Sequence, residues 1–579
     1  MPIDTKKKVA GLLLPVFALR HKDDLGIGDT AAFKDAIEFC ARHGIGCVQV
    51  LPINETGGDN SPYNAISSVA LDPVLLSFSA ASVPGFRESD TDQLIDRGVI
   101  AELRSGPVKY PAVKRLKESL LAAAYDRFLR EDKQQKPGLA ADFDSFKKRH
   151  ASWLPEYTLF RTLMVEQGGN ASWPDWEPEV RNRQAAEAWL PAAPEHERLA
   201  RYRDFCAFIQ WVAFSQWSDV RAFADSHAVR LMGDIPFGVS RYSADVWAEP
   251  ELFELDWSGG APPEPVFAGD LFVKKWGQNW GIPLYNWTAH ADQEFAWWRQ
   301  RVERVGDFFH YFRIDHVLGF FRVYAFPWIP ERNGEFLGLS HEEAAKLTGG
   351  HLPMFLPYAD DQPELAEVNA SQGVALLKVI REAAGDIGIV AEDLGMVPPY
   401  VRPILQALDI PGFYVPPFER HKKDHSYKAK SRIPELCLAT YATHDHMPLA
   451  AFYDDLVEQW HGPDGHQGWL EVQRLMRFLG RDDQNPPAEI TPDLHGSLLE
   501  ALLQSRAWLA VFMITDILLS KQRFNQPGSS GESNWSERLA LTLDAYEASP
   551  EFGPRIKMFA DLIGRSGRVP VRRGQAVAI

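Results

Sequence analysis

Eight short apolar segments recur along the chain, and each ends at a turn. They lie at residues 12–17, 47–52, 230–237, 310–317, 388–395, 412–415, 436–445 and 510–517. Short apolar runs bounded by turn residues are typical of strands that are buried on both faces of a parallel sheet. The pattern therefore predicts eight buried strands.

A helical pattern separates the first two of these strands. Residues 30–43 place Phe33, Ile37 and Cys40 at helical spacing, and Gly44 follows as a stop before the strand at 47–52. A strand, a helix and a further strand in this order favour a parallel sheet. Eight such strands predict an α/β fold, a (β/α)8 TIM barrel with helical insertions at its C-terminal face.

The length of 579 residues fits one barrel with insertions. Residues from about 76 to 200 are rich in Glu, Lys, Arg, Ala and Leu, which predicts a helical insertion before the third strand. Residues from about 330 to 370 contain glycines, prolines and little periodicity, which predicts a second insertion with short helices. We expect a single barrel over residues 1–579. The last segment, from residue 563, carries four arginines and is expected to be solvated or loosely docked: Arg565, Arg568, Arg572 and Arg573.

The N-terminal segment has only part of a signal-peptide pattern. Three lysines precede an apolar run, but the run contains Pro15, ends in a charged stretch and is followed by no small-x-small cleavage site. We interpret the run as the first barrel strand. No segment reaches the roughly 18–20 apolar residues of a membrane helix, so a membrane partner is not expected.

Charge and cysteine content narrow the partners and the compartment. The net charge is −17, from 61 basic and 78 acidic residues, which disfavours nucleic acid and anionic lipid and favours a neutral substrate. The 18 tryptophans include indole faces that could stack on sugars, although most should be core residues. The four cysteines form no CxxC pair, which indicates reduced core thiols in a cytoplasmic protein and no zinc site: Cys40, Cys47, Cys206 and Cys437.

Four of the predicted strands end in acids, at Asp234, Asp315, Glu392 and Asp445. The C-terminal ends of all strands of a (β/α)8 barrel meet around one cavity, so these carboxylates should converge. No cluster of metal-type ligands accompanies them. A group of acids without a metal site suggests chemistry on glycosidic bonds.

Asp315 lies in an alternating segment that also places Arg313 on the same face. A neighbouring guanidinium keeps a carboxylate ionised, and an ionised carboxylate can attack an anomeric carbon. The alternative is a structural ion pair inside the barrel.

Glu392 follows an apolar strand, and apolar surroundings can raise the pKa of a carboxyl so that it serves as a general acid. Asp393 competes for this role, because adjacent strand residues face opposite ways. The alternative for Glu392 is to cap the next helix.

The strand at 436–445 ends in Thr443-His444-Asp445. A second aspartate could stabilise oxocarbenium charge, and His444 could donate to a sugar hydroxyl. On this dipeptide alone, a satisfied strand-end pair is an equally good interpretation.

Further motifs, taken in order, resemble those of one enzyme family. They are Gly26-Ile27-Gly28-Asp29, Gln49-Val50-Leu51-Pro52, Ser61-Pro62-Tyr63, Gly233-Asp234-Ile235-Pro236 with Ser243-Ala244-Asp245-Val246-Trp247, Gly277-Gln278-Asn279-Trp280-Gly281, Phe312-Arg313-Ile314-Asp315-His316, Ala391-Glu392-Asp393-Leu394-Gly395, Thr443-His444-Asp445, and Asn525-Gln526-Pro527-Gly528 with Asn534-Trp535. The chain resembles the 4-α-glucanotransferases of the amylomaltase or disproportionating-enzyme type, glycoside hydrolase family 77. Each motif is modest alone, but nine in family order are specific.

The resemblance implies roles for the acids and for their neighbours. It implies Asp315 as the nucleophile, Glu392 as the acid and base, and Asp445 as the transition-state stabiliser. It also implies a set of sugar contacts: Tyr63, Asp234, Gln278, Trp280, Arg313, His316, His444 and Asn525.

The chain also departs from the family pattern. Many members continue Thr-His-Asp with Asn-Asp-Thr, whereas this chain has His446-Met447-Pro448. The loop at 264–276 is longer than usual and carries lysines; Phe267 or Phe272 could replace the aromatic pair that members hold over the acceptor site. We expect this loop to cover the cleft on the acceptor side.

Together these features predict a retaining 4-α-glucanotransferase without a cofactor, with its carboxyl groups about 5–5.5 Å apart. Its partners would be α-1,4-glucans and maltooligosaccharides, with glucose as an acceptor. One alternative is an α-glucan hydrolase that uses the same acids. The other is a non-catalytic glucan-binding protein on a degenerate barrel.

Overall fold

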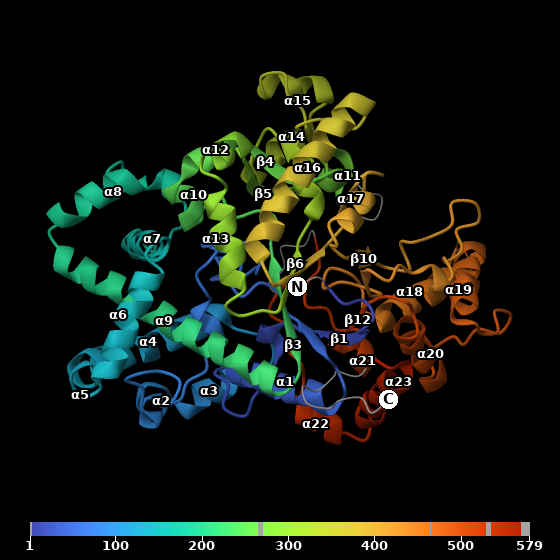
Figure 1. Cartoon of the computed structure of the whole chain (residues 1–579), viewed down its shortest axis with the longest axis horizontal. Coiled ribbons are helices and arrows are strands. Elements are labelled where there is room, and N and C mark those ends of the chain that lie inside the picture. The colour runs from blue at the N-terminus through green and yellow to red at the C-terminus, as the bar shows by residue number, and fades with distance from the viewer. Residues whose placement is uncertain (1–2, 264–269, 464, 528–533, 569–579) are drawn as a thin grey trace.

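Eight parallel strands form the centre of the molecule (Figure 1). The computed structural model describes residues 3–263, 270–463, 465–527 and 534–568. The strands are β1 Val9–Leu13, β2 Cys47–Gln49, β3 Arg230–Ile235, β6 Tyr311–Ile314, β9 Gly388–Ala391, β10 Gly412–Tyr414, β11 Cys437–Ala439 and β12 Leu509–Met513. Each of the eight predicted strands overlaps one of them.

The sheet closes almost completely on itself. Its order is β10-β11-β12-β1-β2-β3-β6-β9, and the Ala391 N–H donates to the Pro411 carbonyl at 2.8 Å, which joins β9 to the start of β10. Side chains from all eight strands share one interior cluster. Its members are Leu13, Cys47, Met232, Val390, Phe413, Leu438, Leu509, Val511 and Met513, with Tyr311 packed against them. A shared interior of this kind is that of a barrel, and the predicted fold class is confirmed.

The first barrel helix begins and ends as its sequence predicts. Helix α1 spans Thr30–Arg42, and the Asp29 carboxylate accepts hydrogen bonds from the backbone N–H groups of Ala31 and Ala32. Gly44 has φ 73°, a left-handed conformation that glycine adopts without strain.

A set of helices lies between β2 and β3. They are α2 Glu88–Leu94, α3 Arg97–Arg104, α4 Tyr110–Arg127, α5 Lys133–Gln135, α6 Pro137–Arg149, α7 Leu154–Glu166, α8 Arg183–Trp189 and α9 His196–Ser226. They occupy the left side of Figure 1, and α9 leads the chain back into the barrel at β3.

A second, antiparallel sheet was not predicted from the sequence. Its order is β5-β4-β7-β8, from β4 Phe253–Ala261, β5 Gln278–Tyr285, β7 Val323–Phe326 and β8 Met354–Leu356. The helices that accompany it are α10 Ala244–Ala248, α11 Leu271–Trp276, α12 Trp287–Asp292, α13 Ala296–Val305, α14 Asn333–Phe336, α15 His341–Leu347 and α16 Pro363–Ala384. This sheet lies at the top of Figure 1, among the segments that connect β3, β6 and β9.

The remaining helices follow β9. They are α17 Val401–Ala407, α18 Leu449–His461, α19 Gly465–Leu479, α20 Pro492–Leu503, α21 Ile514–Leu518, α22 Leu543–Ala548 and α23 Gly553–Ser566.

Each predicted strand is longer than the strand observed, and three of them differ for a clear reason. The first was expected at 12–17, but β1 ends at Leu13, because Pro15 has no N–H for the ladder and a 3-10 turn follows at Val16–Ala18. The segment 436–445 was expected to be strand up to Asp445, but β11 ends at Ala439 and the last six residues form a loop. The segment 510–517 was expected to be strand throughout, but β12 ends at Met513 and helix α21 begins at Ile514.

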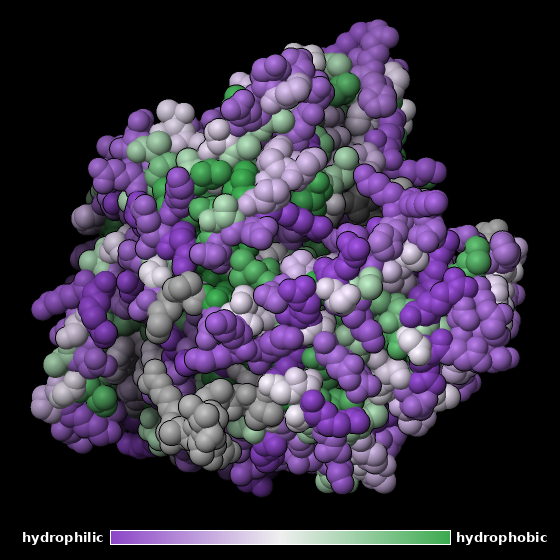
Figure 2. All heavy atoms as spheres, turned by 45° about the vertical axis from the view of Figure 1, so that its right-hand side comes forward, coloured by the Kyte–Doolittle hydropathy of each residue, from purple (hydrophilic) through white to green (hydrophobic). Residues whose placement is uncertain are grey.

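The four cysteines are buried free thiols, as predicted. The cytoplasmic location inferred from them stays a prediction. No helix in the described part of the chain is both long and apolar enough to cross a membrane. On the face shown in Figure 2, most of the exposed side chains are hydrophilic, and hydrophobic side chains are exposed in groups between them.

The expectation of a loosely docked C-terminal segment is wrong for Arg568. Its side chain is fully buried and donates to backbone carbonyls around the start of β1 and β12. The acceptors are Leu503 at 2.7 Å, Ala507 at 2.7 Å, and Val9, Ser505 and Trp508 at 3.1 Å each. One guanidinium has five N–H donors and can therefore bind several backbone carbonyls at a strand end. The spacing of arginines in the sequence does not show which of them makes such contacts.

We therefore expect Arg568→Ala to lower the free energy of unfolding by about 3 kcal/mol or more, because several buried carbonyls lose their charged donor. The matched control is Arg565→Ala on α23, an exposed position where the loss should stay below about 0.5 kcal/mol. The midpoints of denaturant unfolding of the parent protein and of the two variants measure the difference in stability. Equal midpoints for both variants would show that the Arg568 contacts contribute nothing to stability.

Candidate active site

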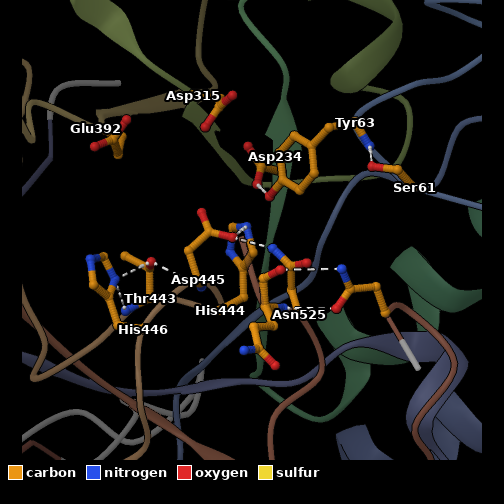
Figure 3. A network of polar contacts seen from close by, with 12 residues as sticks. Ser61, Tyr63, Asp234, Asp315, Glu392, Thr443, His444, Asp445, His446 and Asn525 are labelled. Atoms are coloured by element: carbon orange, nitrogen blue, oxygen red, sulfur yellow. Dashed lines mark hydrogen bonds and ion pairs between the residues drawn. The ribbon is translucent and has the colours of Figure 1, made fainter. Parts of the chain in front are cut away.

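Three neighbouring strands bring the first group of predicted site residues together. In the parallel register Asp234 of β3 lies opposite Arg313 of β6, and Ile314 lies opposite Ala391 of β9. Asp315 and Glu392 are the next residues after these two strands. The carboxyl ends of β3, β6 and β9 therefore present three acids and Arg313 at the same edge. Figure 3 shows the three acids, Asp234, Asp315 and Glu392.

Arg313 connects two of these carboxylates. Its Nη1 donates to both oxygens of Asp234, at 2.8 and 2.6 Å, and its Nη2 donates to Asp315 Oδ1 at 2.7 Å. Burial disfavours the charge, but the two carboxylates raise the pKa of Arg313 well above its usual value. A permanently charged guanidinium thus holds the Asp315 side chain, which remains 27% exposed.

Glu392 is anchored by the backbone of two neighbouring turns. Its Oε2 accepts from the His316 N–H at 2.8 Å, its Oε1 accepts from the Leu394 N–H at 3.0 Å, and it lies 4.0 Å from Arg313 Nη2. Burial raises the pKa of Glu392 to about 7, and the nearby Asp315 acts in the same direction, against Arg313. The raised pKa predicted for this carboxyl is confirmed.

Asp393 faces away from this group. Its carboxylate accepts from Arg402 Nε at 2.8 Å and from the Phe413 N–H at 2.6 Å, and the residue is fully buried. It therefore ties β9 to β10, and of the two adjacent acids only Glu392 lies beside Arg313.

Asp445 lies on the loop after β11 and is oriented by residues from the C-terminal region. Asn525 Nδ2 donates to Asp445 Oδ1 at 2.6 Å, and His444 Nε2 lies 3.3 Å from the same oxygen. Burial by itself would raise the pKa of Asp445, but His444 and the Asn525 amide outweigh it, and the pKa is lowered. An ionised carboxylate is thus held with 39% of its side chain exposed.

Tyr63 joins the Asp234 side of the site to the His444 side. Its hydroxyl donates to Asp234 Oδ2 at 2.7 Å, and its ring stacks on His444 with centroids 5.1 Å apart and planes 12° apart. Trp535 packs against both rings, at 5.8 Å from each. Figure 3 shows Asp234, Asp315, Glu392 and Asp445 around one space, with Tyr63 at its side.

Trp280, Gln278 and His316 form a second wall. Trp280 is 39% exposed, its indole N–H points to Gln278 Oε1 at 3.4 Å, and its ring meets His316 edge-on at 4.9 Å. Burial lowers the pKa of His316 to about 4, so this imidazole is neutral at pH 7. All the predicted site residues are thus placed in these two connected groups of contacts.

Comparisons with known proteins identify the family. A family model described as 4-alpha-glucanotransferase, glycoside hydrolase family 77, matches residues 14–542. The chain belongs to the 4-alpha-glucanotransferase family. It is 30% identical over 564 residues to a 4-alpha-glucanotransferase of Chlamydia caviae, covering 93% of each chain, and 29% identical over 569 residues to that of Thermus thermophilus, covering 96% of this chain and 98% of the relative.

Solved structures of amylomaltases share the fold of this 4-alpha-glucanotransferase. The amylomaltase from Streptococcus agalactiae in complex with acarbose aligns with a TM-score of 0.74 at 20% identity, over 97% of this chain and all of the other. The amylomaltase from Corynebacterium glutamicum aligns with a TM-score of 0.74 at 18% identity, over 96% of this chain and 75% of the other.

The segment that differs most from the family pattern is only partly described. Residues 264–269, including Phe267, lie outside the described residues. Phe272 packs against Phe326 with near-parallel rings 6.2 Å apart, and the Trp276 indole N–H donates to the Phe336 carbonyl at 3.0 Å. Helix α11 is therefore anchored to the antiparallel sheet and to α14. The expected cover over the acceptor side stays a prediction.

Two contributors to the site were missed in the sequence. Arg523 Nη2 donates to the Asp445 backbone carbonyl at 2.8 Å, and the His446 Nδ1 lies 2.8 Å from Thr443 Oγ1. Both contacts shape the turn that carries Asp445. No sequence pattern marks Arg523, because it binds a backbone carbonyl 78 residues away; His446 was visible as a departure from the family motif.

Proposed function

We propose that this member of the 4-alpha-glucanotransferase family transfers α-1,4-glucan segments by a double displacement with net retention. The observation that carries the proposal is the pairing of two different carboxyls around Arg313. Asp315 accepts a hydrogen bond from the guanidinium, whereas burial keeps the pKa of Glu392 near 7. One acid is thereby suited to attack, and the other to donate a proton.

In the first step Asp315 attacks the anomeric carbon of the donor glucan. The bond from that carbon to the glycosidic oxygen breaks as a bond to a carboxylate oxygen of Asp315 forms. Glu392 gives its proton to the departing oxygen, which leaves as the 4-hydroxyl of the shortened glucan. The glucan segment remains covalently attached to the enzyme, and Glu392 is left as a carboxylate.

In the second step the 4-hydroxyl of an acceptor sugar replaces the departed glucan. Glu392 removes the hydroxyl proton while the acceptor oxygen attacks the same anomeric carbon and Asp315 leaves. Two inversions give net retention. Maltooligosaccharides and glucose are the acceptors we propose, and transfer prevails only if the acceptor competes with water.

The remaining residues have roles in binding and charge stabilisation. Asp445, held by Asn525 and His444, supplies a negative charge for the oxocarbenium-like transition state. We assign sugar hydroxyl contacts to Tyr63, Asp234, Gln278, Arg313, His316, His444 and Asn525, and a stacking contact to the exposed Trp280. Within the described residues no group of three or more His, Cys, Asp or Glu side chains is arranged to hold a metal ion.

The product pattern from maltotriose tests the proposed function. Transfer should convert maltotriose into a ladder of longer chains together with maltose and glucose, resolved by chromatography over time. A hydrolase with the same acids would give shorter products only, and a non-catalytic binding protein would leave maltotriose unchanged. Either of these two outcomes would refute the proposal.

A further inference from the structure

A cavity lies outside the group of acids described above. Its volume is about 130 Å3, and its walls come from α7, α10, α13, the turn before α13, and residues 67–69. Helices α7, α10 and α13 lie on the left side of Figure 1. None of the residues assigned to the proposed catalytic site lines this cavity.

The lining offers hydrogen-bonding groups that no other described residue engages. The side chains of Glu249, Gln293, Gln300 and Ser152 line the cavity and form no hydrogen bond to another described residue. Gln293 and Ser152 are exposed, which places them at the entrance, while Glu249 and Gln300 are half-buried. Carboxylates and amides in a small cavity are suitable partners for several hydroxyl groups.

Trp297 adds an apolar wall with a fixed orientation. Its indole N–H donates to Asp245 Oδ1 at 3.1 Å, and its ring packs edge-on against Phe253 and Trp298. The half-buried ring leaves an indole surface at the cavity. An indole beside unused polar groups resembles the mixed lining of a site for a sugar ring.

The cavity is large enough for part of a pyranose. A protein cavity of roughly 150 Å3 accommodates benzene, which has half as many non-hydrogen atoms as glucose. A sugar bound here therefore places one edge of its ring among the polar lining and leaves the rest at the entrance. We propose that this cavity is a second, non-catalytic site for a neutral pyranose such as glucose. The choice of glucose rests on the proposed function, in which glucose is both product and acceptor.

The charges of the lining favour a neutral ligand over a cation. Glu156 forms an ion pair with Arg183, and burial raises the pKa of Glu156 to about 7. Burial also raises the pKa of Glu249, with Glu251 and Asp245 acting in the same direction. Glu156 is therefore partly protonated at pH 7, and within the described residues no group of acids is arranged as a metal site.

The cavity also contacts the loop that carries Tyr63. The Ser68 N–H donates to Asp245 Oδ2 at 2.8 Å, and the Ala244 N–H donates to the Ile66 carbonyl at 2.8 Å. These contacts fix the segment just after Tyr63 against α10. A sugar bound between Ser68 and Trp297 would thus touch the anchoring point of a loop that reaches the proposed catalytic site.

Fluorine NMR of the full chain labelled with fluorotryptophan tests the proposal. Single Trp→Phe substitutions assign two signals, Trp297 for the cavity and Trp280 for the proposed catalytic site. Titration with glucose should shift the Trp297 signal in a saturable way, whereas sorbitol, an open-chain polyol, should not. The two signals are read separately. Failure of the proposed function would appear in the product pattern from maltotriose, independently of the result at Trp297.

Two variants test whether the shift arises in the cavity. Ala296→Phe adds a bulky ring at an exposed lining position and should weaken the response of Trp297 to glucose by at least about tenfold. Gln300→Ala, which keeps the cavity open, should weaken it by a smaller factor. The matched control is Ala407→Phe at an exposed position on α17, which should leave the response unchanged. No saturable shift of Trp297, or an equal shift in all variants, would overturn the proposal.

Discussion

Asp315→Ala is expected to abolish glucan transfer while the protein stays folded. The nucleophile is lost, so the rate should fall on the order of 10,000-fold or more. Stability should change by less than about 1 kcal/mol, because Arg313 keeps both hydrogen bonds to Asp234 and no buried charge loses its last partner. Initial rates on maltotriose and a thermal unfolding curve measure the two effects.

A control for Asp315→Ala is Asp307→Ala, at an acid in the turn before β6 that lies outside the site. It should retain transfer close to that of the parent protein. A folded Asp315→Ala protein that kept more than a few per cent of parent activity would remove Asp315 as the nucleophile, whatever the control shows.

The second large effect is expected for Glu392→Gln. Glutamine keeps the shape of the side chain but has no proton to give, so formation of the glycosyl enzyme from maltotriose should slow by about 100- to 10,000-fold. The same step with α-glucosyl fluoride, whose leaving group needs little protonation, should slow far less. Single-turnover rates with the two donors measure this contrast. Asp393→Asn is the matched control and should slow both donors alike.

The pH dependence of the same step gives an independent check. A carboxyl with a pKa of about 7 is protonated below pH 7 and loses its proton above it. In the parent protein, kcat/KM for maltotriose should therefore fall as the pH rises through 7, and Glu392→Gln should lack this decline. Asp393→Asn should keep the fall of kcat/KM above pH 7. If it abolished that fall, and slowed maltotriose far more than α-glucosyl fluoride, then Asp393 and not Glu392 would be the general acid.

The barrel strands were predictable from sequence because burial on both faces leaves a continuous apolar run at each strand. The acids at the ends of β3, β6 and β9 were predictable for the same reason, since Asp315 and Glu392 follow their runs directly and Asp234 is the next-to-last residue of β3. Alternation also predicted that Arg313 and Asp315 share a face, and they form a hydrogen bond of 2.7 Å.

The other features depend on contacts between distant segments. The antiparallel sheet pairs β4 with β5 and β7. The β4 sequence, Phe253–Ala261, mixes charged, aromatic and glycine residues without a continuous apolar run, so no strand was predicted there. Asp445 was expected at a strand end, yet it lies on a loop whose shape depends on Arg523 and Asn525. Arg568 was misread because its burial depends on five carbonyls from elsewhere in the chain.

The most direct test of the proposed mechanism is to trap the glycosyl enzyme. A fluorinated glucosyl fluoride should form the covalent intermediate quickly and release it slowly, and peptide mass spectrometry after proteolysis identifies the modified residue. We predict one added sugar per chain, attached to Asp315, and release of that sugar when maltose is supplied as an acceptor. A label on any other acid, or turnover of natural donors without any covalent intermediate, would contradict the double displacement at Asp315.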